Sequence, residues 1–398
     1  MTAPPAHRRT CGPAIAVALA LLLGGCGGPA GSSDLGWFGA ENPRRYAGHG
    51  PLRVVWSERI TPEHGGAYLP VERAMAELDP PRDRVYVGSS AGHLYAMTGN
   101  GRRVYRYDAA GAVQSRPALD ADRDELYVGT EQGEVHALRA SDGELRWRES
   151  IGGPIRKEPL LTDDAVYIVT DSDVVGAFSR EDGGPLWSYS REAPEGFSIT
   201  EHAGLALAGG KLITGFTDGV VVALDPIDGR VIWERDTSIE VDTEDGTRPR
   251  FVDVDTTPVV VGDLVYVASF AGGLYALDAA SGTVLWKDAG ITGVVAIAAT
   301  EDVLILASAD EGIVALGVSD RERRWRKALR RGSPTAPVVA GRHVLVGESG
   351  GSFLSLALDS GREVGRFDAG HGFTAPASIR GGLGFVVSNG GSLFAFRY

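Results

Sequence analysis

The chain has 398 residues, and its 55 glycines are about twice the usual share, while 23% of the residues are charged and 43% are hydrophobic. This composition is typical of a globular protein with many turns and excludes collagen-like and disordered chains. The net charge is −13 and no block of Lys or Arg is present, so we do not expect a nucleic-acid partner.

The amino-terminal segment has the pattern of an export signal. The apolar run Ala14–Leu23 has about 10 residues, whereas a membrane-spanning helix needs about 20. The tetrapeptide LGGC that ends at Cys26 resembles the bacterial lipobox, in which the cysteine carries a diacylglyceryl group. We therefore expect a lipoprotein signal peptide over residues 1–25, lipidation of Cys26 and a flexible tether over residues 26–50.

Two further points concern this cysteine. An ordinary signal peptide with an incidental Cys26 is the alternative interpretation, and the glycine at position 27 favours the outer over the inner membrane. The other cysteine, Cys11, also precedes the globular region. No disulfide, thiolate zinc site or c-type haem attachment is therefore expected in the body of the protein.

Eight apolar strings of β type recur along the rest of the chain. Each contains one equivalent large residue, and the spacings between successive equivalents are 41, 40, 46, 53, 39, 40 and 40 residues. The equivalents are Tyr86, Tyr127, Tyr167, Ile213, Tyr266, Ile305, Leu345 and Phe385. Because a period of about 40 residues is typical of propeller blades, the sequence predicts eight repeats.

Each repeat has the same order of turns and strands. A turn, usually with glycine, follows the apolar strand, and a second strand and a second turn lead to a strand that usually contains tryptophan. The tryptophans are Trp147, Trp187, Trp233, Trp286 and Trp325, with Tyr105 and Gly365 in two other repeats. We expect these aromatic residues to pack between blades rather than to stack on a cofactor.

A short extended piece precedes each repeat and often contains proline, as at Pro117 and Pro258. Proline cannot donate to a β-ladder, so we expect this piece at a sheet edge that faces a central channel. The last repeat lacks its outer strand, and residues 52–58 (LRVVWSE) have the alternation and the tryptophan of that strand. The predicted fold is therefore all-β, an eight-bladed β-propeller over residues 51–398 with four-stranded blades, closed by pairing of an N-terminal strand with the C-terminal blade.

Three stretches carry a family resemblance: ALRASDGELRW (137–147), ALDPIDGRVIW (223–233) and ALDAASGTVLW (276–286). They are similar to the repeat of quinoprotein-like propellers. Within that superfamily, residues 253–287, the lipobox and the final GGSLFAFRY resemble the BamB family, lipoproteins of the outer-membrane β-barrel assembly machine. The resemblance implies a non-enzymatic scaffold, a monomeric propeller at the periplasmic face of the outer membrane of a Gram-negative bacterium.

The two anomalous spacings are adjacent, and they insert residues around 190–203 and 237–251. Insertions in neighbouring repeats lie on neighbouring loops, often on a binding face. In the resembling family two such loops contact the POTRA region of BamA. By resemblance, Phe197 and Ile199 would be the apolar anchors of that surface, and Asp253 and Asp255 the acidic pair that selects a basic partner.

These assignments have alternatives that the sequence leaves open. Asp253 and Asp255 would also suit a turn in which the carboxylates accept backbone N–H bonds. Phe197 and Ile199 would also suit burial under a long loop. Where the family pattern has a basic residue, this chain has Thr200, so that polar contact is not expected.

A cofactor-using quinoprotein dehydrogenase is the enzymatic alternative. That family typically adds a vicinal cysteine pair, calcium ligands and a catalytic aspartate within a longer chain, and no cysteine pair follows Cys26 here. None of the eight histidines has metal-binding helical spacing, so we expect isolated surface or loop histidines, no cofactor and no metal. The remaining alternative is a lipid-anchored sensory or ligand-binding propeller that uses the mouth of its channel, because propellers have many functions.

Overall fold

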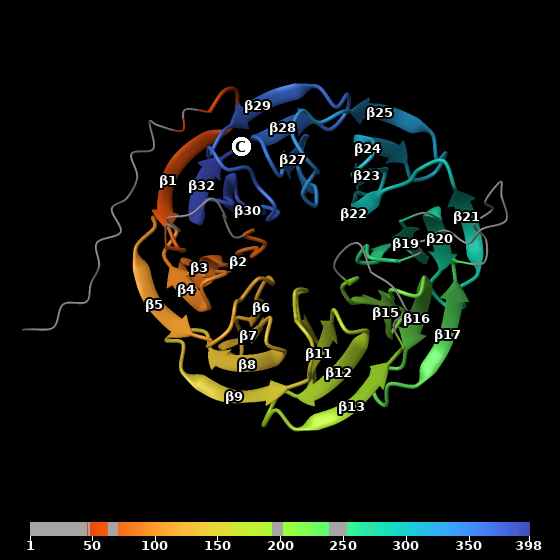
Figure 1. Cartoon of the computed structure of the whole chain (residues 1–398), viewed down its shortest axis with the longest axis horizontal. Coiled ribbons are helices and arrows are strands. Elements are labelled where there is room, and N and C mark those ends of the chain that lie inside the picture. Colours follow the sequence, from red (N-terminus) through yellow and green to blue (C-terminus); the bar gives the residue numbers. More distant parts are fainter. Residues whose placement is uncertain (1–45, 47, 63–70, 193–201, 239–252, 271) are drawn as a thin grey trace, which may run out of the picture. The chain divides into compact units, whose positions relative to one another are not determined.

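The computed structural model describes residues 46, 48–62, 71–192, 202–238, 253–270 and 272–398. Compactness divides the chain into residues 1–37 and 38–398, and every described residue belongs to the second unit. The described strands form eight four-stranded antiparallel sheets around a central axis (Figure 1). The predicted all-β, eight-bladed propeller is therefore confirmed.

The strands follow one another along the chain, four to a blade, and the blades are numbered in chain order from β2–β5 to the last blade, which contains β30–β32 and β1. A short 3-10 helix, Pro80–Arg82, lies between β2 and β3, and no helix in the described ranges is long and apolar enough to cross a membrane. Blades 1 to 4 contain β2 (Glu77–Asp79), β3 (Arg84–Gly88), β4 (His93–Met97), β5 (Arg103–Asp108), β6 (Ala118–Asp120), β7 (Glu125–Gly129), β8 (Glu134–Arg139), β9 (Leu145–Ser150), β10 (Leu160–Leu161), β11 (Ala165–Thr170), β12 (Val174–Ser179), β13 (Pro185–Ser190), β14 (Ala206–Ala208), β15 (Lys211–Gly215), β16 (Val220–Leu224) and β17 (Val231–Asp236). Blades 5 to 8 contain β18 (Val259–Val261), β19 (Leu264–Ser269), β20 (Gly273–Asp278), β21 (Val284–Asp288), β22 (Val294–Ala299), β23 (Val303–Ser308), β24 (Gly312–Gly317), β25 (Arg323–Lys327), β26 (Val338–Ala340), β27 (His343–Gly347), β28 (Phe353–Ala357), β29 (Glu363–Phe367), β30 (Ser378–Arg380), β31 (Leu383–Val387), β32 (Ser392–Arg397) and β1 (Arg53–Arg59).

Each blade runs from an innermost strand to an outermost strand, as in the order β2-β3-β4-β5. The two middle strands are almost wholly buried because each blade is covered by a neighbour on both faces, which explains their continuous apolar sequences. Prolines such as Pro117 and Pro258 directly precede the innermost strands β6 and β18. The predicted position of the proline-containing pieces is therefore confirmed.

The ring is closed by strands from the two ends of the described propeller. Strand β1 pairs antiparallel with β32, from Arg53 opposite Arg397 to Arg59 opposite Ser392, with a bulge between Val54 and Trp56. The pairing lies one residue later than the predicted residues 52–58. Blade 8 is completed in this way, and its outermost strand is the first of the described strands (Figure 1).

The residues before β1 also form hydrogen bonds with blade 7. His49 and Arg366 of β29 exchange two backbone hydrogen bonds, of 2.8 and 3.1 Å. A Cβ atom on Gly365 would lie 2.7 Å from the carbonyl oxygen of His49, so the glycine in this repeat leaves room for the crossing segment. Tyr46 packs edge-on against Phe394 with ring centroids 5.0 Å apart. Tyr46 and His49, which the sequence assigned to the tether, thus contact blades 7 and 8.

The tryptophans of the outermost strands join each blade to the next. Their indole N–H groups donate to a backbone carbonyl in the second turn of the following blade, over 2.8 to 3.2 Å, at Trp56, Trp147, Trp187, Trp233 and Trp325. Each ring covers a glycine with positive φ in that turn, such as Gly229 beneath Trp187. The expectation that these residues pack between blades is confirmed.

Trp286 is the exception among these rings. The equivalent turn of blade 6 has Arg321 in place of glycine, also with positive φ (62°). Its guanidinium carbon lies 5.4 Å from the centre of the Trp286 ring, so a cation–π contact takes the place of stacking on glycine.

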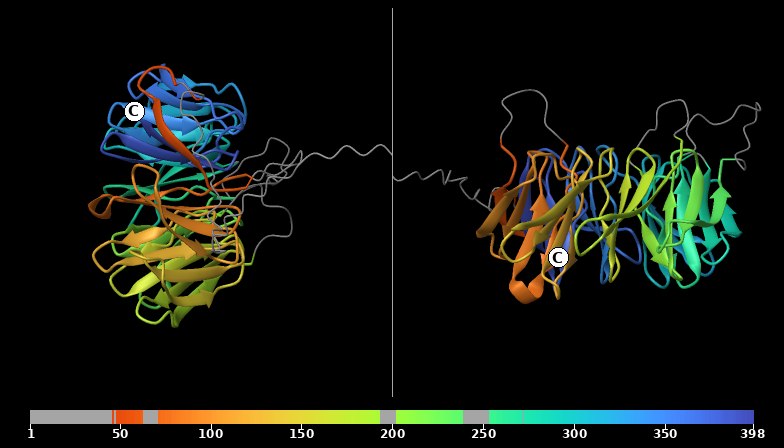
Figure 2. Two further views of the ribbon diagram at one scale, coloured as in Figure 1. Left: turned by 90° about the vertical axis from the view of Figure 1, so that its left-hand side faces the viewer. Right: turned by 90° about the horizontal axis from the view of Figure 1, so that it is seen from below.

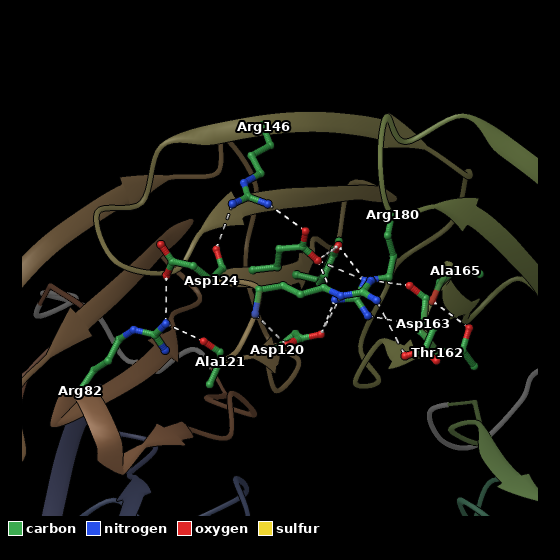
Figure 3. A network of polar contacts seen from close by, with 12 residues as sticks. Arg82, Asp120, Ala121, Asp124, Arg146, Thr162, Asp163, Ala165 and Arg180 are labelled. Carbon is green, nitrogen blue, oxygen red and sulfur yellow. Dashed lines mark hydrogen bonds and ion pairs between the residues drawn. The ribbon is translucent and has the colours of Figure 1, made fainter.

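A buried network of ion pairs joins blades 2 and 3 (Figure 3). It lies on the face of the ring opposite the connections that lead from the outermost strand of one blade to the innermost strand of the next. The Arg180 side chain is 5% exposed, and its guanidinium lies 2.6 Å from both Asp120 and Glu125. It also donates to the carbonyl of Thr162 over 2.7 Å. The buried charge is fully paired, which is the condition for its being tolerated between two blades.

The contact between tryptophan and glycine predicts a graded effect of alanine substitution. In Gly229→Ala, the alanine must adopt positive φ (72°), and its methyl group would lie 2.5 Å from the Trp187 ring. Gly262 also has positive φ (60°), but nothing lies within 4 Å of its Cβ position. We expect Gly262→Ala to lower the free energy of unfolding by about 1 to 2 kcal/mol, measured by urea unfolding. Gly229→Ala, as a separate variant, should lower it by about 1 to 3 kcal/mol more than Gly262→Ala does. Equal losses would contradict the packing role of this glycine.

Candidate partner-binding face

The two inserted segments occupy equivalent connections in neighbouring blades. One lies between β13 and β14, and the other between β17 and β18. Because strands alternate in direction within a blade, every connection from an outermost strand to the next innermost strand leaves the same face of the ring. The predicted anchors Phe197 and Ile199 lie outside the described residues, as does the predicted lipidation site Cys26.

The first insertion begins against the turn Phe216–Gly219 of blade 4, which we call the anchoring turn. The guanidinium of Arg191, the second last described residue before the gap at 193–201, donates to the Asp218 carboxylate over 2.7 Å. The same group lies 5.8 Å from the centre of the Phe216 ring. Arg191 also donates its backbone N–H to the carbonyl of Asp173 over 3.1 Å. The entry to this connection is therefore held by two blades.

The first insertion also ends against the anchoring turn. His202 is 2% exposed, its Nε2 lies 2.9 Å from an Asp173 carboxylate oxygen, and its ring meets Phe216 edge-on at 5.2 Å. The backbone N–H and the hydroxyl of Thr217 both donate to the same carboxylate. Asp173 has φ of 56°, a left-handed conformation that aspartate adopts more readily than most residues. The exit of the connection is thus bonded to turns of blades 3 and 4.

The second insertion starts and finishes at the same turn. Thr237 donates its N–H over 2.9 Å and its hydroxyl over 2.7 Å to the carbonyl of Gly219. After the gap at 239–252, Val254 donates its N–H to the carbonyl of Phe216 over 3.2 Å. One four-residue turn therefore contacts all four ends of the two insertions.

The charge on Asp173 is stabilised in this buried place. Burial alone would raise the pKa of its carboxyl, but the adjacent His202 ring and the hydrogen bonds from Thr217 hold that pKa below its usual range. The ionised form is therefore the one that the anchoring contacts require.

The expectation of isolated surface or loop histidines is wrong for His202. It is also wrong for His136, which is 1% exposed and lies 2.9 Å from the Tyr107 hydroxyl.

The two predicted acidic residues are not surface groups in this structure. Asp253 is 4% exposed and Asp255 is 7% exposed. The backbone carbonyl of Asp253 accepts a hydrogen bond from the N–H of Phe270 over 2.9 Å, so the chain is fixed where it enters blade 5. Burial is compatible with the alternative interpretation, a turn in which the carboxylates accept backbone N–H bonds, and both that interpretation and direct contact with a partner stay predictions.

The comparison with known sequences decides the family. A sequence model of the family described as "Outer membrane protein assembly factor BamB" matches residues 90–327, more than half of the chain. The chain belongs to the BamB family. The protein named outer membrane protein assembly factor BamB from Yersinia pestis is 29% identical over 272 residues, and the match spans 65% of this chain and 65% of that relative.

Solved structures support the same fold. The crystal structure of BamB from Moraxella catarrhalis has a TM-score of 0.72 at 22% identity, over 87% of this chain and all of that one. A quinohemoprotein alcohol dehydrogenase from Pseudomonas putida HK5 has a TM-score of 0.63 at 12% identity, over 87% of this chain and 76% of the enzyme. The likeness to the enzyme is one of fold. Within the described ranges no group of three or more His, Cys, Asp or Glu residues is placed to hold a metal ion.

The contacts at the anchoring turn predict an effect of pH. The Asp173 carboxyl, whose folded pKa is lowered, binds fewer protons in the folded than in the unfolded protein. Its contribution is therefore complete above about pH 4 and is lost as the pH falls through the lower folded pKa. We expect Asp173→Asn to cost about 1 to 3 kcal/mol at pH 7 and less at pH 3, measured from urea midpoints.

The control for this prediction is Asp163→Asn, because the Asp163 side chain is 97% exposed. That variant should follow the wild-type stability at every pH. If the stability of Asp173→Asn stayed parallel to that of the wild type between pH 7 and pH 3, the carboxylate would have no special role in the anchoring contacts.

Proposed function

We propose that this protein is a non-enzymatic scaffold of outer-membrane β-barrel assembly that binds the periplasmic POTRA region of BamA with the face that carries the two insertions. The observation that carries this proposal is the convergence of both insertions on the anchoring turn, Phe216–Gly219, in a chain of the BamB family. Relatives in the family are named outer membrane protein assembly factors, which supports the same role.

The anchoring contacts suit a binding surface. A partner that binds a pre-organised loop loses less affinity to the ordering of that loop. The four ends are held by buried groups, Asp173 and His202 among them, and the blades beneath them are locked by the closed ring. Apolar side chains at Phe197 and Ile199 would supply the anchor residues, and nearby carboxylates would favour a basic partner and speed its association.

The buried Asp253 and Asp255 have an indirect part in this proposal. Both residues lie at the end of the second insertion, where the backbone carbonyl of Asp253 fixes the chain before β18 and the carboxylates would add negative potential to the face. The overall charge of −13 acts in the same direction. We infer that a basic partner surface is attracted to this face even where no carboxylate is directly exposed.

The anchor and the compartment complete the proposal. A diacylglyceryl group on Cys26 would place the propeller at the periplasmic face of the outer membrane, and the residues that follow would let it reach BamA. The described propeller begins by Tyr46, so about twenty residues would separate the lipid from the packed ring. No bond chemistry is required, since the role is to bind and position.

The proposal predicts the effect of removing the apolar anchors. We expect the double variant Phe197→Ala with Ile199→Ala to bind the purified periplasmic region of BamA at least tenfold more weakly, because each buried anchor contributes about 1 kcal/mol or more. Affinity would be measured by calorimetry at low salt, and co-purification from detergent extracts would report the same loss.

A matched control removes equally apolar side chains elsewhere. Leu186 and Leu285 are 53% and 50% exposed on the outermost strands β13 and β21. Their double alanine variant should bind as the wild type does. Unchanged affinity in the Phe197 and Ile199 variant, or an equal loss in the control, would exclude the insertions as the main contact.

A further inference from the structure

The innermost strands share an aliphatic position in addition to the large residue that marks each repeat. In each repeat, one residue directly precedes the large equivalent residue, as Leu126 precedes Tyr127. Its cross-strand partner on the innermost strand is aliphatic in every blade, as at Leu119. None of these residues is fully buried, and Leu207 and Val260 are 46% and 37% exposed. The set, which we call the aliphatic girdle, consists of Leu78, Leu119, Leu161, Leu207, Val260, Ala299, Val339 and Ile379.

Two cavities meet at this girdle along the innermost strands of blades 2 and 3. One has a volume of about 460 Å³ and the other about 600 Å³, and both are lined by Leu119 and Leu161. The first is also lined by Glu77, Arg116 and Glu158. Both cavities therefore combine shared aliphatic side chains with charged groups, a combination found in small-molecule sites.

The charges in the first cavity are shared unequally. Arg116 lies 2.5 Å from the carboxylate of Glu77 but 3.4 Å from that of Glu158. The Glu158 side chain is 45% accessible, and it lines the cavity. Partial burial raises the pKa of Glu158 above its usual range, while Arg116 opposes the shift and Glu77 adds to it, and solvent at the exposed part of the side chain screens these effects. A carboxylate in this situation gains from a cation that enters the cavity.

The second cavity also offers acidic groups. It is lined by Asp120, Asp122 and Asp163. Arg180 lines it too, but its guanidinium is already bonded to Asp120 and Glu125. Arg123 lies 3.8 Å from the exposed carboxylate of Asp163. The carboxylates of the second cavity are thus shared with arginines, and Glu158 in the first cavity is the acidic group that carries the inference.

We propose that the cavity between blades 2 and 3 binds an aliphatic ammonium group, with the alkyl chain against Leu119 and Leu161 and the ammonium at Glu158. The source of that group is either a free linear polyamine or the side chain of a lysine in a peptide. The proposal is independent of binding to BamA, because none of the residues that carry it lies in the anchoring turn or in the two insertions.

The affinity should rise with pH. The charged groups around the Glu158 carboxyl are Arg116, Glu77 and the neighbouring Lys157, and Arg380 acts on Glu77 from β30. An alkylammonium keeps its charge up to about pH 10, so the group that changes between pH 6 and pH 8 is Glu158. The ligand should bind more tightly at pH 8 than at pH 6.

The test is calorimetry of the full-length protein with 1,6-diaminohexane, with hexan-1-ol as the uncharged probe. We expect the diamine to bind and the alcohol to bind at least tenfold more weakly. Glu158→Gln should weaken diamine binding about tenfold, which corresponds to one charge-assisted contact of about 1.4 kcal/mol. Spermidine and a capped lysine tripeptide, titrated in parallel, distinguish the free polyamine from the peptide source.

The matched control is Glu144→Gln, which removes a carboxylate that is 63% exposed and pairs with Arg139 over 2.7 Å. It should leave diamine binding unchanged. Because the Glu158 side chain is 45% exposed, Glu158→Gln should fold as the wild type does. Equal binding of the diamine and the alcohol, unchanged binding in Glu158→Gln, or an equal loss in the control would overturn the proposal.

Discussion

The pairing of β1 with β32 is the constraint on which the rest of the structure depends. A propeller blade buries its faces only against its neighbours, so an open ring would leave two blades each with one uncovered face. Here the closing strand is bonded along its length, from Arg53 to Arg59, and the preceding residues cross to β29. The seam that lacks a tryptophan in blade 7 is filled instead by an aromatic cluster that includes Phe353, Phe367 and Phe394.

The repeating features were predictable because each of them is encoded within one repeat. Tyr127 and Trp147 recur at fixed spacing, so a single sequence contains eight versions of the same pattern. Gly365 was noted as a departure, but its cause, the carbonyl of His49, comes from the other end of the propeller. A contact between residues more than 300 positions apart cannot be predicted from the pattern within one repeat.

The same limit explains what the sequence missed at the candidate site. The spacing identified the two insertions, because they lengthen two adjacent repeats. The contacts of Asp173, His202 and Thr217 come from separate turns of two blades, and the histidine has no motif around it. The burial of Asp253 and Asp255 depends on how the second connection meets blade 5. Chain order alone could place these carboxylates at a loop end, but not on its inner or outer side.

The fold thus separates two regions with different chemistry. The two faces of the ring are seen from the side in Figure 2. One face carries the ends of the insertions, held by the anchoring turn of blade 4, whereas the cavities at the aliphatic girdle lie along the innermost strands and include Leu207 of β14 in blade 4. Rigid closure serves both, because it fixes the turns at the face and the width of the channel. The proposed scaffold would present one surface to a protein and the proposed cavity to a small ammonium group.

Hydrogen exchange of the full-length protein, followed by mass spectrometry with and without the periplasmic region of BamA, tests the proposed binding face most directly. The result we predict is slower exchange in the anchoring turn and in residues 190–203 and 237–251, with no change at the turn Asp120–Asp124 on the opposite face. Protection confined to that opposite face, or to the outermost strands, would contradict the assignment of the binding surface.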